Sequence, residues 1–104
     1  MGTPAKLKTA LVQMACTAQR STNLERVEEQ LSAASHQGAQ LVLLQELHNS
    51  LYFCQSEDAA NFDLAEPVPG PSTDELSRLA AGMQLVIVTS LFERRAAGLY
   101  HNTA

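Results

Sequence analysis

Hydrophobic residues follow two patterns along the chain. Three short segments, 6–16, 41–45 and 85–91, are rich in apolar residues with few interruptions. Segments of this kind are typical of strands buried on both faces of a parallel sheet. Between them, apolar residues recur every three or four positions, which is typical of an amphipathic helix packed on one side. The pattern therefore predicts strands that alternate with helices.

Each predicted helix has one apolar stripe and a polar start. The stripes consist of Leu24, Val27, Leu31 and Ala34 in the first helix and of Leu76, Leu79, Ala80 and Met83 in the second. Thr22 and Ser72 each precede a glutamate by three residues, the spacing of a capping box that satisfies free N–H groups at a helix start. Gly38 is placed to end the first helix in a left-handed conformation.

The connections predict a layered α/β fold. A strand, a helix and a second strand within residues 6–45 form a βαβ unit with parallel strands. Residues 47–71 form a long loop, and loops of that length in compact domains usually face a ligand or serve a function. A hairpin over 92–99, turning at 95–98, leads into a further strand at 100–104. The order β-α-β-α-β-β opens an α/β domain without completing it, so we expect residues 1–104 to be the N-terminal portion of one larger domain.

Composition and charge exclude several classes of function. The 104 residues include seven Lys and Arg against eleven Asp and Glu, a formal net charge of −4, and they form no basic stripe. Nucleic-acid binding therefore has no electrostatic basis. No apolar run approaches the length of a membrane span, and the first six residues lack the apolar core of a signal peptide. Two cysteines without zinc spacing form no disulfide framework, so we expect a cytoplasmic protein.

The carboxyl ends of parallel strands are where open α/β sheets bind ligands. Glu46 comes just after the second apolar strand, so we expect its carboxylate to be held at that edge of the sheet and partly desolvated, an environment that suits proton transfer. An alternative is that Glu46 caps a loop or pairs with a Lys or Arg. Cys16 and Cys54 lack the strand–turn–helix setting of an activated thiol.

The three histidines carry no clear metal signal. His48 lies two residues after Glu46, but Glu-x-His is too short a motif to indicate a metal site, so we expect a loop histidine that lines a cleft. We expect His36 near a helix C-terminus, where an imidazole interacts favourably with the helix dipole, and His101 on a strand surface.

Five short motifs, in this order along the chain, resemble the nitrilase superfamily of carbon–nitrogen hydrolases. They are Leu11-Val12-Gln13-Met14, the apolar strand 41–45 running into Glu46, Pro69-Gly70-Pro71 before a helix, Ser90-Leu91-Phe92-Glu93, and Tyr100-His101-Asn102-Thr103-Ala104. Within that superfamily, Glu46-Leu47 followed by Tyr52-Phe53-Cys54-Gln55 is most similar to the N-carbamoylputrescine amidase branch.

The resemblance implies a fold and a mechanism. The family fold is an α-β-β-α sandwich, usually paired through its outer helices, which implies a homo-oligomer. Glu46 matches the general base of the family's Glu-Lys-Cys triad, whose Lys and Cys would lie beyond residue 104. The implied reaction is hydrolysis of N-carbamoylputrescine to putrescine, CO2 and ammonia without a metal or organic cofactor. His48, Tyr52 and Phe53 are candidates for lining the substrate pocket.

Two alternatives stay open. Another amidase of the superfamily, ureidopropionase-like or omega-amidase-like, would bind a carboxylate substrate with arginine. Glu57 and Asp58, and the absence of basic residues between 47 and 77, favour a cationic substrate instead. A complete flavodoxin-like binding module would need a helix after the last strand. Because the nucleophile is missing, we expect the 104-residue chain alone to be inactive, and with one bare sheet face we expect it to self-associate.

Overall fold

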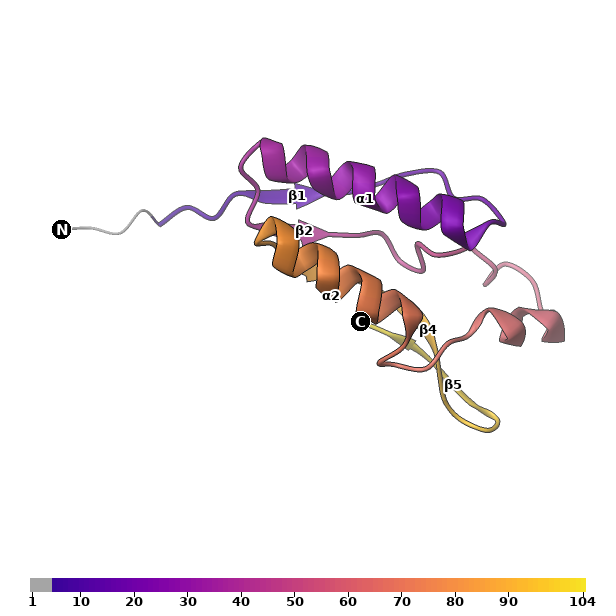
Figure 1. The fold of residues 1–104 in the computed structure, drawn as a ribbon. Helices are drawn as coiled ribbons and strands as arrows, with labels where there is room; N and C mark the ends of the chain where they lie inside the picture. The colour runs from indigo at the N-terminus through magenta and orange to yellow at the C-terminus, as the bar shows by residue number, and fades with distance from the viewer. Residues whose placement is uncertain (1–4) are drawn as a thin grey trace.

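A computed structural model describes residues 5–104, which form a parallel sheet, two helices and a hairpin (Figure 1). The sheet consists of β1 (Thr9–Leu11), β2 (Leu41–Leu43) and β3 (Val86–Val88), in that order. The helices are α1 (Arg20–His36) and α2 (Pro71–Met83), and the hairpin pairs β4 (Leu91–Ala96) with β5 (Leu99–Thr103). A 3-10 helix, η1 (Ala59–Leu64), lies in the long loop. Residues 1–4, which belong to the segment assessed as a signal peptide, lie outside the described residues.

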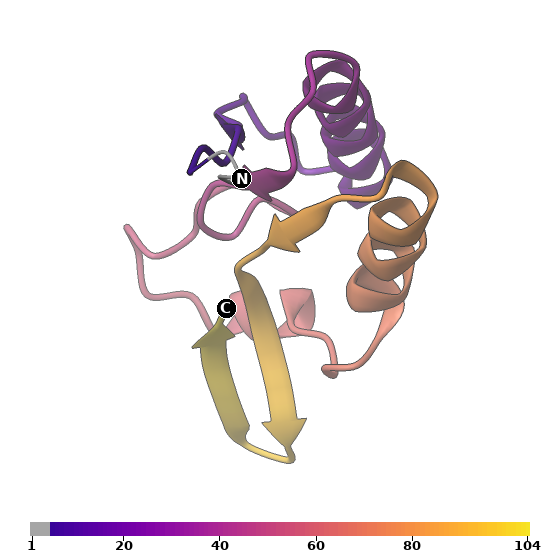
Figure 2. The same cartoon turned by 90° about the vertical axis from the view of Figure 1, so that its left-hand side faces the viewer.

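Both helices cover the same face of the parallel sheet (Figure 2). The predicted stripes supply the contact, because Val27 and Leu31 of α1 and Leu76 and Leu79 of α2 are all buried. They pack in one cluster with Val42, which lies at the centre of β2 and is completely buried. Burying each such aliphatic side chain contributes about 1.5–3 kcal/mol, so this layer provides the main core of the described chain.

The opposite face of the sheet is uncovered. Leu11, Leu43 and Val88 lie side by side in the strand register and are 77%, 43% and 38% exposed. The prediction of strands buried on both faces is therefore wrong for residues 5–104, since no described element lies over this side. The expectation of one bare apolar sheet face is confirmed.

The strands are shorter than the apolar segments that predicted them. β1 ends at Leu11. Three residues later, the Met14 N–H donates a hydrogen bond to the side-chain oxygen Oε1 of Gln45 at 2.6 Å. A side chain thus replaces the next bond of the parallel ladder, and the chain leaves the sheet. The βαβ unit itself is confirmed, with β1 parallel to β2 and β2 parallel to β3.

Both helices begin earlier than predicted. α1 begins at Arg20 because the Asn23 side chain exchanges hydrogen bonds with Thr17 and so closes the preceding turn. α2 begins at Pro71, whose fixed φ suits the first helical position, and the Thr73 hydroxyl accepts the Gly70 N–H at 2.7 Å. The capping boxes expected at Thr22 and Ser72 are therefore wrong. The left-handed end of α1 is confirmed, with φ 87° at Gly38.

The hairpin forms a separate antiparallel sheet. Its turn includes Gly98, at φ 73°, and a register shift between Arg94 and Ala96 marks a β-bulge. The strand predicted at 100–104 is β5, which pairs with β4 and not with the parallel sheet. In the preceding loop, Glu66 bonds to β4 through both of its backbone groups. Within residues 5–104, neither helix has the length and apolar character needed to cross a bilayer.

Candidate active site

Glu46 lies three residues beyond β2, and its side chain reaches the hairpin. Its Oε1 accepts a hydrogen bond from Asn102 Nδ2 at 2.6 Å, and Asn102 Oδ1 accepts one from Ser90 Oγ at 2.8 Å. This chain of bonds fixes the carboxylate from β5 and from the segment between β3 and β4. Neither ion pair among the described residues involves Glu46. Its side chain is exposed, so the expected partial desolvation is not found, because no described element lies above this edge of the sheet.

The backbone around Glu46 makes a sharp reversal. Leu47 has a left-handed φ of 53° and is nonetheless buried, with 4% of its surface exposed. A left-handed conformation costs a residue with a Cβ atom roughly 1–2 kcal/mol, so burial of Leu47 has to compensate for it. The reversal sends Leu47 and His48 inward and leaves Glu46 facing outward.

His48 is enclosed within the chain and does not line an open cleft, contrary to the expectation. Only 1% of its surface is exposed, and its Nε2 lies 2.6 Å from Thr89 Oγ1. Burial lowers the pKa of His48 to about 4, so the imidazole is neutral at pH 7. Its Nδ1 has no hydrogen-bond partner among the described residues. The residue therefore supports the loop from within.

Cys16 contacts the same loop. Its Sγ donates to the backbone oxygen of His48 at 3.2 Å and accepts from Gln45 Nε2 at 3.4 Å. Burial raises the pKa of the Cys16 thiol, an effect that Arg26 partly offsets, so the thiol stays protonated at neutral pH. These contacts agree with a structural cysteine, which is what the sequence suggested.

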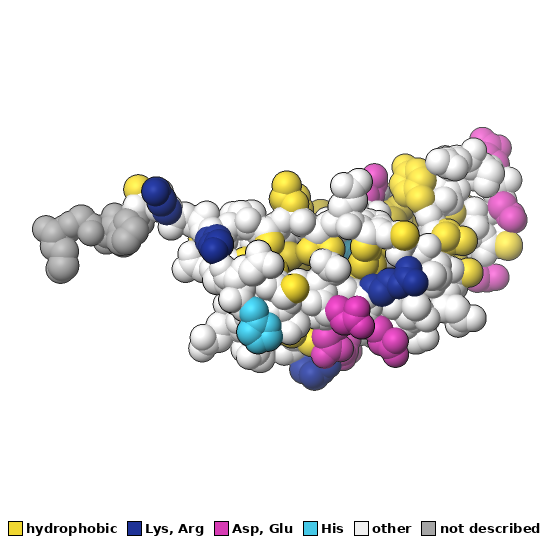
Figure 3. All heavy atoms as spheres, turned by 90° about the horizontal axis from the view of Figure 1, so that it is seen from above, with side chains coloured by type: hydrophobic (Ala, Val, Ile, Leu, Met, Phe, Trp, Pro, Cys, Tyr) yellow, Lys and Arg dark blue, Asp and Glu magenta, His cyan; other side chains and the backbone are white. Residues whose placement is uncertain are grey.

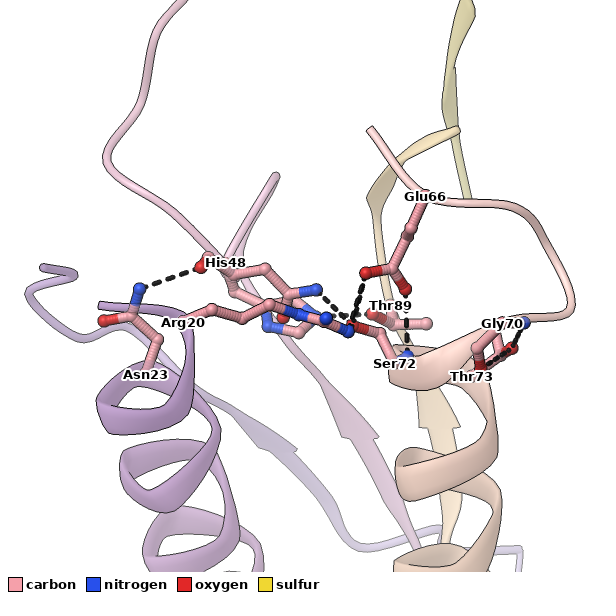
Figure 4. A network of polar contacts seen from close by, with 9 residues as sticks. Arg20, Asn23, His48, Glu66, Gly70, Ser72, Thr73 and Thr89 are labelled. Atoms are coloured by element: carbon pink, nitrogen blue, oxygen red, sulfur yellow. Dashed lines mark hydrogen bonds and ion pairs between the residues drawn. The ribbon is translucent and has the colours of Figure 1, made fainter. Parts of the chain in front are cut away.

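A buried polar network joins the starts of the two helices (Figure 4). Glu66, 8% exposed, forms an ion pair with Arg20 at 2.7 Å and accepts the Ser72 N–H at 2.9 Å. The buried Ser72 hydroxyl donates to Glu66 and accepts from Asn49 Nδ2 and from Arg20 Nη2. Asn23 Nδ2 donates to the backbone oxygen of Asn49 at 2.9 Å. The loop after β2 is therefore tied to both helices.

Sequence reasoning missed Glu66 and Arg20. The signal for Glu66 was its place just before the proline-rich start of a helix, where a carboxylate is stabilised by free N–H groups. Beside the network is a cavity of about 190 Å³, whose lining includes Arg20, Asn49, Glu66 and Phe92. The three residues expected to line a pocket, His48, Tyr52 and Phe53, are not among those that line this cavity.

Tyr52 and Phe53 make none of the contacts of the polar network. Tyr52 is half exposed, and its pKa is raised by the neighbouring Cys54 thiol and, to a smaller degree, by the charge of Glu46. Phe53 packs against Phe92 of β4 with ring centres 4.9 Å apart and lines a second pocket of about 390 Å³. The structure thus brings Tyr52 near Glu46 and places Phe53 in a pocket wall.

Two other sequence expectations concern histidines and metals. His36 and His101 are exposed, in the last turn of α1 and on β5 respectively, as predicted. In the part of the chain that the structure covers, no three His, Cys, Asp or Glu side chains come together in a group that could hold a metal ion.

Comparisons with known proteins agree with this fold. The chain is 38% identical over 96 residues to an N-carbamoylputrescine amidase of Solanum lycopersicum, an alignment that covers 91% of this chain and 32% of that protein. It is 34% identical over 99 residues to an omega-amidase of Bos taurus, covering 95% of this chain and 34% of the relative. The crystal structure of a carbon-nitrogen hydrolase from Helicobacter pylori G27 matches with a TM-score of 0.85 at 39% identity, over 92% of this chain and 33% of that one.

The chain spans about a third of the length of these relatives. The structural match confirms the predicted class, an α/β fold of the nitrilase type. Residues 8–104, which include every element described above, match the carbon–nitrogen hydrolase family. The chain belongs to the carbon–nitrogen hydrolase family of the nitrilase superfamily, whose members are amidases and related hydrolases.

Proposed function

We propose that residues 1–104 are the N-terminal part of one longer hydrolase domain that hydrolyses N-carbamoylputrescine, with Glu46 as the general base. The observation that carries the proposal is the fixed position of the Glu46 carboxylate, held by Asn102 at 2.6 Å at the carboxyl edge of the sheet. A general base has to be held at a defined position to accept a proton efficiently. Asn102 and Ser90 act in this proposal as positioning residues.

In the proposed reaction, Glu46 accepts the proton of a cysteine thiol that lies beyond residue 104. The thiolate attacks the carbamoyl carbon, and a lysine ammonium, also beyond residue 104, stabilises the oxyanion. Protonated Glu46 returns its proton to the leaving ammonia, which produces a carbamoyl thioester. Glu46 then takes a proton from water, and the resulting hydroxide cleaves the thioester. The carbamic acid released breaks down to CO2 and putrescine, and the thiol is restored.

The charge of the loop supports a cationic substrate. Glu57 and Asp58 are exposed, and the sequence has no Lys or Arg between residues 47 and 77. The relative from Solanum lycopersicum bears the name of an N-carbamoylputrescine amidase. A substrate with a free carboxylate, as an omega-amidase-like or ureidopropionase-like enzyme would take, would need basic groups at this site. A flavodoxin-like module is disfavoured by the family match over residues 8–104.

The proposed function also implies the partners of the protein and its location in the cell. We expect a small-molecule substrate as the ligand, no nucleic-acid partner, a cytoplasmic location and a homo-oligomer that pairs through the outer helix faces.

The test is Glu46→Gln in the full-length protein, with ammonia release from N-carbamoylputrescine as the measurement. Loss of a general base typically lowers the rate by about 10²–10⁴-fold, so we expect at least about a hundredfold loss. Glu28→Gln, an exposed glutamate on α1, is the matched control and should retain the parent rate. Activity of Glu46→Gln within tenfold of the parent would show that Glu46 is not the base.

A further inference from the structure

Four aromatic rings from three segments form a partly exposed cluster beside the hairpin. Ring centres are 4.9 Å apart for Phe53 and Phe92, 4.5 Å for Phe62 and Tyr100, and 5.6 Å for Phe92 and Tyr100. Phe62 is 49% exposed, and none of the four belongs to the core beneath the helices. A group of partly exposed aromatic side chains outside the core is typical of a binding surface.

Three of the four rings line the open pocket of about 390 Å³. Phe53, Phe62 and Phe92 supply its apolar walls, and Glu57 and Asp58 supply its charged side. Ligand sites commonly have volumes of about 300–1,000 Å³ and combine apolar walls with a few polar groups. The pocket is therefore large enough for a short aliphatic chain with one polar end.

The charge of the pocket is negative. No Lys or Arg is among the described residues that line the pocket. Arg94, which is paired with Tyr100 in the hairpin register, lies closer to the hairpin turn and does not belong to the pocket wall. At the right-hand end of Figure 3, the end at which η1 lies in Figure 1, acidic and hydrophobic side chains are interspersed, and no Lys or Arg is visible there. Aromatic faces and carboxylates both attract an ammonium group, so this pocket suits a primary alkylammonium ion.

The pocket adjoins Glu46 through the hairpin. Phe92, in the pocket wall, lies directly opposite Asn102 in the register of β4 and β5. Side chains of directly opposed residues lie on the same face of a hairpin, with Cβ atoms about 4.5–5.5 Å apart. Asn102 is the residue that holds the Glu46 carboxylate. The aromatic pocket and Glu46 are therefore on one face, separated by one side chain.

We propose that this pocket binds the alkylammonium end of the substrate while the ureido group lies at Glu46. The assignment of the ureido group rests on the proposed function, whereas binding of an alkylammonium ion by the pocket does not. Phe53, Phe62 and Phe92 contact the methylene chain, and Glu57 and Asp58 balance the ammonium charge. These residues select a cationic chain over a neutral or anionic one of equal length.

The first test is binding without catalysis. 1,4-Diaminobutane is titrated into the ¹⁵N-labelled full-length protein, with butyrate as the anionic comparison. We expect shifts confined to the amides of residues 53–62 and 92, and we expect butyrate to leave them in place. Phe62→Leu and Glu57→Gln should each weaken diamine binding about two- to fivefold, the effect of one exposed cation–π or charge contact. Leu64→Ala in η1 and Glu28→Gln on α1 are the matched controls and should bind as the parent does.

Equal shifts with butyrate, or unchanged affinity in both Phe62→Leu and Glu57→Gln, would overturn the proposal. A second test separates it from the proposed function. In the full-length protein, Phe62→Leu should lower the preference for N-carbamoylputrescine over the neutral N-pentylurea, which has a methyl group in place of the ammonium, by a similar two- to fivefold factor. If Glu46→Gln abolishes hydrolysis but Phe62→Leu leaves the substrate preference unchanged, the pocket assignment fails and the proposed function stands. If the diamine binds as expected but the full-length parent protein does not hydrolyse N-carbamoylputrescine, the proposed function fails and the pocket assignment stands.

Discussion

Glu46 and His48 are two residues apart, yet their environments are opposite. Glu46 is exposed and bonded to Asn102, whereas His48 is enclosed and bonded to Thr89. The left-handed Leu47 between them causes the difference, because it reverses the chain direction. At this scale the backbone conformation of one residue decides which side chain is exposed and which is buried.

Burial of neutral His48 makes the stability of the chain depend on pH. Its pKa is lowered from 6.5 to about 4, so the unfolded chain binds a proton that the folded chain does not bind between these values. The free energy of unfolding should therefore be highest above pH 6.5 and should fall by roughly 3 kcal/mol as pH drops to 4. Chemical denaturation at several pH values measures this decrease.

The control for that experiment removes a different histidine. His48→Gln should flatten most of the decrease, whereas His36→Gln, at an exposed position in the last turn of α1, should retain it. Parallel pH profiles for the parent and His48→Gln would show that burial of this imidazole does not set the acid sensitivity.

The sequence predicted Glu46 at the carboxyl edge of the sheet because an apolar strand directly precedes it. It did not predict the inward direction of His48, because alternation along a loop does not show a left-handed residue such as Leu47. It also did not pair Glu66 with Arg20, since their ion pair depends on how the loop before α2 packs against the start of α1 and not on spacing along the sequence.

At the scale of elements, the start of α2 depends on a close approach between two loop segments. A Cβ atom at Gly70 would lie 2.2 Å from the backbone oxygen of Pro67, and φ is −166° there, an extended value open to any residue. Gly70 is therefore required for space and not for backbone freedom. The capping box predicted at Ser72 does not form, because the Ser72 hydroxyl donates to Glu66 in the preceding loop instead.

Replacing two glycines should have opposite effects on stability. Gly70→Ala should destabilise the chain by about 1–3 kcal/mol, the usual range for overpacking against atoms that cannot move freely. Gly82→Ala, within α2 and with no atom within 4 Å of the added Cβ, should stabilise it by about 0.5–1 kcal/mol. Thermal unfolding of the two variants measures both. A neutral Gly70→Ala would mean that the turn at 67–70 relaxes without loss.

At the scale of the whole molecule, the parallel sheet has a covered face and a bare face. The sequence predicted the helix-covered layer well, because the stripes of α1 and α2 have the helical period. The bare face could not be recognised from β1, β2 and β3 alone, because their residues are apolar on both sides. Both described helices lie on one face of the sheet, so nothing within residues 5–104 covers the other face. The exposed side chains there are Leu11, Leu43, Val86 and Val88.

This bare face should make the isolated chain self-associate. Sedimentation velocity at increasing concentration should show larger species. Leu11→Lys with Val86→Lys should raise the concentration needed for association roughly tenfold or more, since burial of one aliphatic side chain is worth about 1.5 kcal/mol. Leu99→Lys, an exposed position near the hairpin turn, is the control and should leave association unchanged. A monodisperse parent chain at all concentrations would contradict this expectation.

The loop that carries Glu46 and the segment that carries Phe53 and Phe62 are held by different contacts. Loop residues 45–49 are anchored to Met14 after β1, to α1 and to α2, whereas Phe53 and Phe62 rest on the hairpin. Substitutions at Phe53 and Phe62 should therefore leave these anchors in place, and Asn102 of the hairpin should still hold the Glu46 carboxylate. On the proposed assignment of the pocket, changes within residues 53–62 should alter which molecules the protein binds while Glu46 keeps its place at the sheet edge, so directed evolution of substrate range should begin there.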